Sequence, residues 1–325
     1  MNAKDLRIVF MGTPEFAVPS LTALVENGYN VVAVVTTPDK PAGRGLKTHE
    51  SDVKKAAMKM GLPILQPEKL KDPDFVETMK ALRPDLGIVI AFRMLPEIIW
   101  AMPTFGTFNL HASLLPQYRG AAPINWAIIN GEKETGVTTF MLNHEIDKGG
   151  IIGQIREPIG DDDTVGSVYD RLMETGKGLV LDTVERIAAG TANPVEQQHI
   201  DESTLKPAPK IFKEDCRIDW AKGGRTIIDF IRGLSPYPAA WTELYSADNA
   251  PLTAKIFSAR FIPGDARATE AGKLSSDGKS YIHISCADGK IDISELQIAG
   301  KKRMSVRELL LGFRNVGQYT CQVRK

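Results

Sequence analysis

The fold of this chain is decided by its opening stretch, LRIVFMGTP at residues 6–14, an apolar run that ends in a Gly-Thr-Pro turn. Apolar residues recur with helical spacing between residues 16 and 25, and a valine-rich run follows at residues 29–36. A strand, a turn, a helix and a second strand in this order predict a parallel α/β sheet. The turn lacks the Gly-x-Gly-x-x-Gly spacing of a dinucleotide site, and its proline suits the first turn of a helix. We therefore expect no dinucleotide there.

The same alternation continues to about residue 190. It predicts helices near 52–60, 74–82, 123–130 and 165–189, and strands near 63–66, 86–91, 107–111 and 136–142. The proline-rich, polar stretch at 191–208 lacks periodicity and predicts a linker. Beyond it, one amphipathic helix and short strand-like runs with Asp-Gly turns predict a small β-barrel. We expect two domains, 1–190 and 209–325, joined by that linker.

The bulk properties are those of an ordinary globular protein. The chain has 325 residues, of which 43% are hydrophobic and 25% charged, and such a length favours two domains. Its first residues lack the apolar core of a signal peptide, and no apolar run reaches membrane-spanning length. The three cysteines are widely spaced, which favours reduced thiols over disulfides or a zinc site. We expect a cytoplasmic protein without a membrane partner or a metal.

The zero net charge hides an uneven distribution. From Lys206 to Lys325 there are 20 Lys and Arg against 13 Asp and Glu, a balance of +7, so residues 1–205 carry −7. A basic C-terminal part suits a polyanion such as RNA. An unevenly charged solvated surface explains the count equally well, so charge alone leaves the partner open.

The string NLHASLLPQYRG at residues 109–120 places a carboxamide and an imidazole two residues apart, after an apolar run. If Asn109 and His111 lie at the end of a strand, their side chains point to the same side. A neutral hydrogen-bond donor beside an imidazole, which exchanges protons near neutral pH, suits proton transfer as charge develops on a carbonyl oxygen. A turn-capping asparagine and a histidine bonded to a backbone carbonyl are the alternative.

This string resembles the signature of the folate-dependent formyltransferases, and further motifs of the family occur in order from MGTPEFA at 11–17 to GKKRM at 300–304. The resemblance implies a Rossmann-like, mostly parallel catalytic sheet followed by an OB-like barrel. It implies transfer of the formyl group of 10-formyltetrahydrofolate to the amino group of methionine on initiator methionyl-tRNA, by a monomer. A small amine, such as an amino sugar nucleotide or glycinamide ribonucleotide, is the alternative acceptor. A non-catalytic RNA-binding module is the alternative from another class.

An active-site imidazole needs a third polar group to orient it and stabilise its cation. By residue type alone, His144, Glu145 and Asp147 compete for this role, and the resemblance assigns it to Asp147. The family has Asp-Thr-Gly-Asp where this chain has Asp-Lys-Gly-Gly, so the Thr and the second Asp are absent. Asn109 would donate to the oxyanion, an interaction worth about 3 kcal/mol. His111 would assist the oxyanion or relay the amine proton to the folate nitrogen.

The resemblance also implies a folate pocket at two segments. Most relatives carry glycine where this chain has Arg93, which alters the segment expected to wrap the pterin. A helix beginning at Pro96, without a ligand, is the alternative for the first segment. The pocket residues implied are Phe92, Leu95, Ser113, Leu114, Leu115 and Pro116.

Two regions carry the cations expected to meet tRNA. The stretch TPDKPAGRGLK at 37–47 has the composition of a surface loop, and the resemblance implies that it enters the acceptor stem. Its candidate contacts are Lys40, Arg44 and Lys47. The linker and the C-terminal domain carry basic residues suited to the RNA backbone, namely Lys206, Lys210, Arg232, Lys301, Lys302 and Arg303.

Overall fold

The computed structural model describes residues 2–42, 47–197, 201–246, 250–264, 270–313 and 316–321, with the backbone alone at 40–42 and 47–48. The chain divides into two compact units. The first comprises Met1–Gly120, Thr135–Pro158 and Tyr169–Pro207. The second comprises Ala121–Glu134, Ile159–Val168 and Ala208–Lys325.

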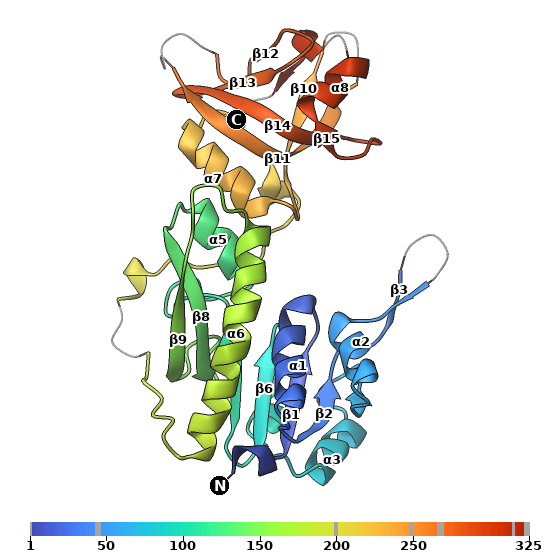
Figure 1. Ribbon diagram of the computed structural model, residues 1–325, viewed down its shortest axis with the longest axis vertical. Coiled ribbons are helices and arrows are strands. Elements are labelled where there is room, and N and C mark those ends of the chain that lie inside the picture. Colours follow the sequence, from blue (N-terminus) through green and yellow to red (C-terminus); the bar gives the residue numbers. More distant parts are fainter. Residues whose placement is uncertain are drawn as a thin grey trace. The chain divides into compact units, whose positions relative to one another are not determined.

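The first unit is built on a seven-stranded sheet in the order β5-β2-β1-β6-β7-β8-β9 (Figure 1). The pairs β2–β1, β1–β6 and β6–β7 are parallel, whereas β7 and β8 are antiparallel. The mostly parallel, Rossmann-like sheet predicted from the sequence is therefore confirmed. The strands are β1 (Ile8–Gly12), β2 (Val31–Val35), β5 (Ile64–Leu65), β6 (Leu86–Ile90), β7 (Thr107–His111), β8 (Glu134–Met141) and β9 (Ile151–Pro158).

Helices along the chain begin at residues suited to capping. Ser51 accepts a hydrogen bond from the Lys54 amide at the start of α2, and Asp72 caps α3, which opens with Pro73. The long α6 lies against the sheet, where the Thr183 hydroxyl is 2.8 Å from that of Thr139 on β8. The helices are α1 (Val18–Glu26), α2 (Asp52–Lys59), α3 (Pro73–Ala81), α4 (Glu97–Trp100), α5 (Pro123–Ile129) and α6 (Val165–Ala188).

A short antiparallel hairpin of β3 (Lys40–Ala42) and β4 (Lys47–His49) extends from the first unit. Its base is anchored at Asp39, which accepts hydrogen bonds from Lys54 and from Gln66. These hydrogen bonds, that of Lys54 above all, hold the pKa of the Asp39 carboxyl below its usual range. The segment predicted as a loop therefore contains a β-ribbon.

The second unit contains a seven-stranded antiparallel sheet, with six strands in the order β12-β13-β14-β11-β10-β16 and β15 paired to β14. A bridge between Lys273 and Thr320 joins the two ends of this order, and the Cys321 amide donates to the Gly272 carbonyl at 2.8 Å. The sheet thus curls into the predicted barrel. Its strands are β10 (Ala240–Tyr245), β11 (Leu252–Pro263), β12 (Leu274–Ser276), β13 (Ile282–Cys286), β14 (Gly289–Ile298), β15 (Met304–Ser305) and β16 (Thr320–Cys321).

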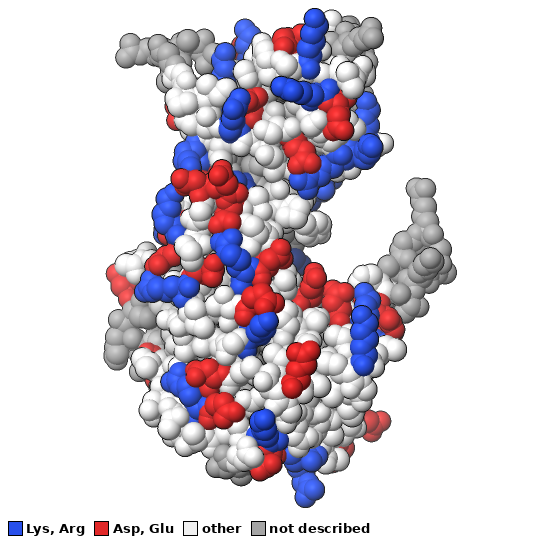
Figure 2. Space-filling model, viewed as in Figure 1, with Lys and Arg blue, Asp and Glu red and all other residues white. Residues whose placement is uncertain are grey.

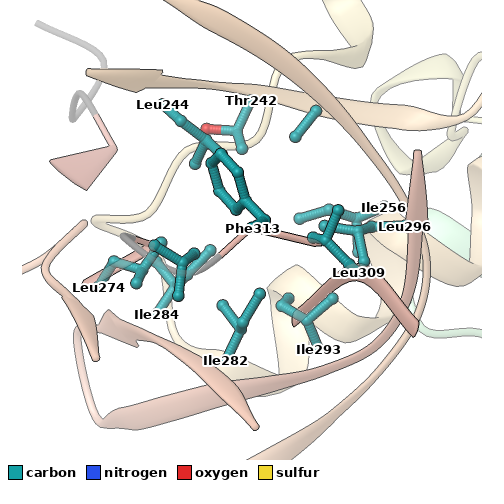
Figure 3. A pocket seen from close by; sticks show the side chains of 12 residues that line it. Thr242, Leu244, Ile256, Leu274, Ile282, Ile284, Ile293, Leu296, Leu309 and Phe313 are labelled. Atoms are coloured by element: carbon teal, nitrogen blue, oxygen red, sulfur yellow. The ribbon is translucent and has the colours of Figure 1, made fainter. Parts of the chain in front are cut away.

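The barrel interior is apolar. Figure 3 shows Leu, Ile and Phe side chains converging on a small internal space, with Thr242 as the polar group among them. The Thr242 hydroxyl is satisfied, because it accepts from the indole of the fully buried Trp220 at 3.0 Å. α8 (Val306–Gly312) starts with a capping box formed by Ser305 and Glu308.

α5 belongs to the second unit, where it packs on α7 (Gly224–Leu234). The contact is close, because a Cβ at Gly233 would lie 2.6 Å from the Ile129 side chain and 3.0 Å from the Asn125 carbonyl oxygen. The Asn125 side chain donates to the Gly233 carbonyl at 2.8 Å. Two segments that precede residue 190 therefore group with residues 208–325.

Candidate active site

Asn109 and His111 lie on β7, at the edge where the parallel strands end. β7 runs between β6 and β8, and Asn109 is in register with Val89 on one side and Phe140 on the other. Because side chains alternate along a strand, the carboxamide and the imidazole share one face of the sheet. Ligands of open α/β sheets bind at this edge.

The imidazole of His111 is nearly buried, with 7% of the residue exposed. Its Nε2 lies 2.8 Å from the carbonyl oxygen of Tyr118. That oxygen can only accept, so Nε2 carries the hydrogen and Nδ1 is the nitrogen free to take up a proton. Nδ1 lies 3.9 Å from Oδ2 of Asp147, so a carboxylate faces the atom that becomes charged.

Asp147 is the polar residue of its loop that the structure brings to His111. Its Oδ2 also accepts a hydrogen bond from the Gly120 amide at 2.9 Å. Glu145 instead pairs with Lys148, and His144 packs edge-on against Trp100 on the exposed side of the loop. The arrangement suits stabilisation of an imidazolium by Asp147.

The Asn109 side chain carries an unsatisfied polar atom. Its Oδ1 is buried and has no hydrogen-bond partner among the described residues. A buried polar group without a partner costs about 1–3 kcal/mol, so a ligand that donates a hydrogen bond to this oxygen would recover that energy. The residue predicted to contact the reacting carbonyl is therefore the one with unused hydrogen-bonding capacity.

Three non-glycine residues around this edge have left-handed backbone conformations. They are Ala91 after β6 (φ 47°), Tyr118 (φ 59°) and Asp147 (φ 55°). Such conformations cost on the order of 1–3 kcal/mol each and persist only where the surroundings enforce them. At Tyr118 and Asp147 the backbone conformation aims the groups that contact His111.

The loop after β7 is fixed from within. The Ser113 hydroxyl donates to the Gln117 carbonyl at 2.7 Å, and the Ser113 carbonyl accepts from Thr138 on β8 at 2.6 Å. Gln154 on β9 donates to the Leu115 carbonyl at 2.8 Å. Ser113 and Leu115 are buried, whereas Leu114 and Pro116 are partly exposed. The four predicted pocket residues here thus shape the loop, and the two that reach its surface are Leu114 and Pro116.

The segment after β6 provides the other predicted pocket residues. Phe92 and Leu95 are partly buried against a core cluster of the first unit. Arg93 is tied to the loop after β5, since its guanidinium donates to the carbonyls of Pro67 and Glu68. Burial lowers the pKa of Arg93 below its ordinary value. Met94, in contrast, is 77% exposed, so this segment presents apolar surface to solvent.

The predicted tRNA contacts have different environments. Arg44 lies outside the described residues, and Lys40 and Lys47 are described only as paired positions of the β3–β4 hairpin. Lys206, Lys210 and residues 301–303 are exposed. On the face of the second unit seen in Figure 2, Lys and Arg alternate with Asp and Glu rather than forming one continuous patch.

Arg232 is not a surface residue. It is 8% exposed, and its guanidinium donates to the carbonyls of Gly160 and Asp163 and to the carboxylate of Asp229. An amphipathic helix seen in sequence does not show which of its cations faces inward. Arg232 therefore stabilises the second unit and is unsuited to bind RNA.

Sequence reasoning missed the backbone groups of the site, the Tyr118 carbonyl and the Gly120 amide. Neither has a side-chain signature, although both lie in the quoted motif. It also missed the linker residue Gln197, whose amide contacts the Asp147 loop. Among the residues described, no cluster of three or more His, Cys, Asp or Glu could hold a metal, and no helix could span a membrane.

Comparison with known proteins defines the class first. The formyl transferase profile matches residues 6–184, and that of the formyl transferase C-terminal domain matches residues 210–314. The chain belongs to the formyl transferase family. Within it, the methionyl-tRNA formyltransferase of Parabacteroides distasonis is 56% identical over 323 residues, covering 98% of this chain and 99% of that protein.

Two solved structures share the fold at low identity. HypX from Aquifex aeolicus, in complex with tetrahydrofolic acid, aligns with a TM-score of 0.62 at 19% identity over 94% of this chain and 47% of its own. The N-formyltransferase from Helicobacter canadensis, in complex with folinic acid and dTDP-3-aminofucose, aligns with a TM-score of 0.63 at 22% identity over 89% and 98%. At these identities the similarity concerns the fold alone.

Proposed function

We propose that this chain transfers a formyl group from 10-formyltetrahydrofolate to the amino group of methionine on initiator methionyl-tRNA, giving formylmethionyl-tRNA for translation initiation. The observation that carries the chemistry is the pair of polar groups at the end of β7: the Asn109 carboxamide, which shares a face of the sheet with His111, and the His111 Nδ1 that faces Asp147 at 3.9 Å. The 56% sequence identity to a methionyl-tRNA formyltransferase, over 98% of this chain, supports methionyl-tRNA as the acceptor.

In the proposed reaction the methionine amine attacks the formyl carbon, and the formyl oxygen becomes an oxyanion. The Nδ2 of Asn109 donates to this oxygen, an interaction worth about 3 kcal/mol in the transition state. The bond between the formyl carbon and the folate nitrogen then breaks, and that nitrogen gains the proton that the amine loses. His111 relays this proton through Nδ1 or assists the oxyanion, an acid–base role worth roughly 100- to 10,000-fold.

Asp147 acts on His111 rather than on the substrates. A carboxylate 3.9 Å from Nδ1 stabilises the imidazolium formed when the ring takes up the proton. The Tyr118 carbonyl, 2.8 Å from Nε2, fixes the tautomer in which Nδ1 is the accepting atom. Covalent formyl transfer through Ser113 is disfavoured, because its buried hydroxyl donates inside its own loop.

The substrates are assigned to surfaces around this edge. The folate is proposed to lie against Phe92, Leu95, Leu114 and Pro116, where partly exposed apolar groups flank the end of β7. The tRNA is proposed to meet the segment 37–47 through Lys40, Arg44 and Lys47. In the linker and second unit the candidates are Lys206, Lys210, Lys301, Lys302 and Arg303. The monomeric state and the cytoplasmic location remain predictions.

The test is a formyl-transfer assay with several acceptors. The protein is incubated with 10-formyltetrahydrofolate and, separately, charged initiator tRNA, glycinamide ribonucleotide or an amino sugar nucleotide. We expect formylmethionyl-tRNA to accumulate in the first reaction. Formylation of a small amine, without formylation of the tRNA, would contradict the proposal.

A further inference from the structure

The linker residue Gln197 connects the two loops that form the site. Its Nε2 donates to the carbonyl oxygens of Asp147 at 3.0 Å and Gly149 at 2.8 Å. Its Oε1 accepts from the guanidinium of Arg119 at 2.7 Å, one residue before the Gly120 amide that binds the Asp147 carboxylate. One carboxamide therefore uses both its ends on the segments that carry the contacts of His111.

These hydrogen bonds act where the backbone needs support. Asp147 has a φ of 55°, a conformation that is unfavourable for a residue with a side chain. Two residues further on, the chain passes so close to β8 that a Cβ at Gly149 would lie 1.6 Å from the Met141 carbonyl oxygen. Gln197 binds the carbonyls on both sides of Lys148, and so holds the strained turn from outside.

Neighbouring parts of the linker hold the same loop. Val195 and Ile151 exchange two backbone hydrogen bonds of 2.8 Å, which places the linker alongside the start of β9. Lys148 pairs with Glu202 at 2.8 Å, and this hydrogen bond raises the pKa of Lys148 and lowers that of Glu202. Glu202 is an exposed partner, so Gln197 is the contact that reaches the backbone of Asp147.

We propose that Gln197 is a positioning residue for the reaction: it fixes the Asp147 turn, and thereby the carboxylate that faces His111. The linker thus positions a group of the site through Gln197 and also connects to the second unit. The kinetic consequences of this inference rest on the proposed function. The stabilisation of the Asp147 turn by Gln197 can be measured without an assay of formyl transfer.

The kinetic test uses the full chain with Gln197→Met, which keeps the side-chain length and removes the amide. Gln197→Glu keeps an acceptor for Arg119 but replaces the donating amide by a carboxylate oxygen that faces the two carbonyls. Each variant leaves two carbonyls without their hydrogen bonds, and we expect kcat to fall about tenfold with the KM for tRNA unchanged.

Gln117→Met is the matched control. Gln117 also joins the site loop to the linker, donating to the Thr204 carbonyl at 3.2 Å and accepting from the Lys206 amide at 2.8 Å. It makes no hydrogen bond to the described residues 143–150. We expect this variant to keep kcat within about twofold, since its side chain makes no hydrogen bond to His111 or to the Asp147 turn in the described part of the chain.

A double-mutant cycle separates positioning from a general loss of structure. If Gln197 acts through Asp147, Gln197→Met should cause no further loss of kcat once Asp147→Asn has been introduced. A full tenfold loss in that background would overturn the proposal, as would unchanged kcat in both single Gln197 variants.

Hydrogen exchange provides a readout that does not depend on formyl transfer. Peptides covering residues 143–150 should exchange about tenfold faster in Gln197→Met than in the parent or in Gln117→Met, because the turn opens more often. Equal exchange in all three proteins would overturn the hold on the turn. A parent that exchanges as expected but formylates no tRNA would contradict the proposed function instead.

Discussion

The end of β7 in the first unit and the interior of the barrel in the second unit use buried polar groups in opposite ways. At the strand end, the Asn109 Oδ1 is left without a partner among the described residues, and Tyr118 and Asp147 hold left-handed conformations. In the barrel, Thr242 is satisfied by Trp220 and surrounded by aliphatic side chains (Figure 3). The unpaired oxygen and the strained backbone lower the stability of the first region and leave groups available to a ligand. The second region contributes only packing.

The largest expected effect on formyl transfer comes from the strand end. Asn109→Ala and His111→Ala should each reduce kcat by at least about 100-fold, because both groups act at the developing charge. Asn109→Ala removes a buried Oδ1, unpaired among the described residues, so it should not lower the free energy of unfolding. Steady-state kinetics and denaturant unfolding check the two halves of this prediction, and a near-normal kcat would remove that residue from the mechanism.

The hairpin should give the next largest effect. Arg44→Ala removes a guanidinium able to make paired hydrogen bonds to phosphate or base edges, and one such contact is worth about 1–3 kcal/mol. Formylation of methionyl-tRNA should therefore fall roughly tenfold, with folate binding unchanged. Lys47 can cover part of the loss, so Lys47→Ala is the companion variant. Equal activity of Arg44→Ala and the parent would direct attention to a small-amine acceptor.

The barrel interior should show the reverse of the strand end. Ile284 is 2% exposed and lines the internal space, so Ile284→Ala should destabilise the second unit by about 2–5 kcal/mol. At a temperature where the variant stays folded, kcat should remain within a few-fold of the parent. A 100-fold loss of kcat in the folded variant would contradict the view that the barrel interior contributes stability and not catalysis.

The smallest effect concerns the thiol of Cys321. Burial raises its pKa to about 12 from an ordinary value of 9.0. Since the folded pKa is the higher one, the stabilising contribution is complete below pH 9 and is lost as the pH rises towards 12. Iodoacetamide at pH 9 should therefore label Cys321 only after unfolding, without affecting formyl transfer. Peptide mapping that shows rapid labelling of the native protein would contradict this.

The sequence predicted those helices and strands whose pattern of apolar residues matches their burial in the folded chain. The strand containing Asn109 and His111 follows an apolar run, and the first sheet was recoverable from alternating patterns. β9 was not predicted, because much of Ile151–Pro158 is exposed and carries no apolar alternation. Arg232 is an RNA candidate in the sequence because it is a basic residue of the C-terminal part. Its partners Gly160 and Asp163, which bury it, lie about seventy residues away in the sequence.

Sequence patterns also fail to predict some of the single groups that form the site. Motif spacing points to Asn109 and His111, and the family resemblance points to Asp147. Neither points to the Tyr118 carbonyl, because any residue type can present a carbonyl group. In the sequence Gln197 lies in a polar linker, and only the folded chain brings it to the turn that it holds. Long-range hydrogen bonds from unremarkable residues are the part of a site that sequence patterns do not carry.

The central claim is that the groups at the end of β7 deliver a formyl group to methionyl-tRNA. The most direct measurement traces isotope-labelled formyl from 10-formyltetrahydrofolate in one mixture of charged initiator tRNA, glycinamide ribonucleotide and an amino sugar nucleotide. We predict label on the methionine of the tRNA with the parent protein, and about 1% of that amount or less with Asn109→Ala in the same time. Label on a small amine, or equal labelling of the tRNA by both proteins, would contradict it.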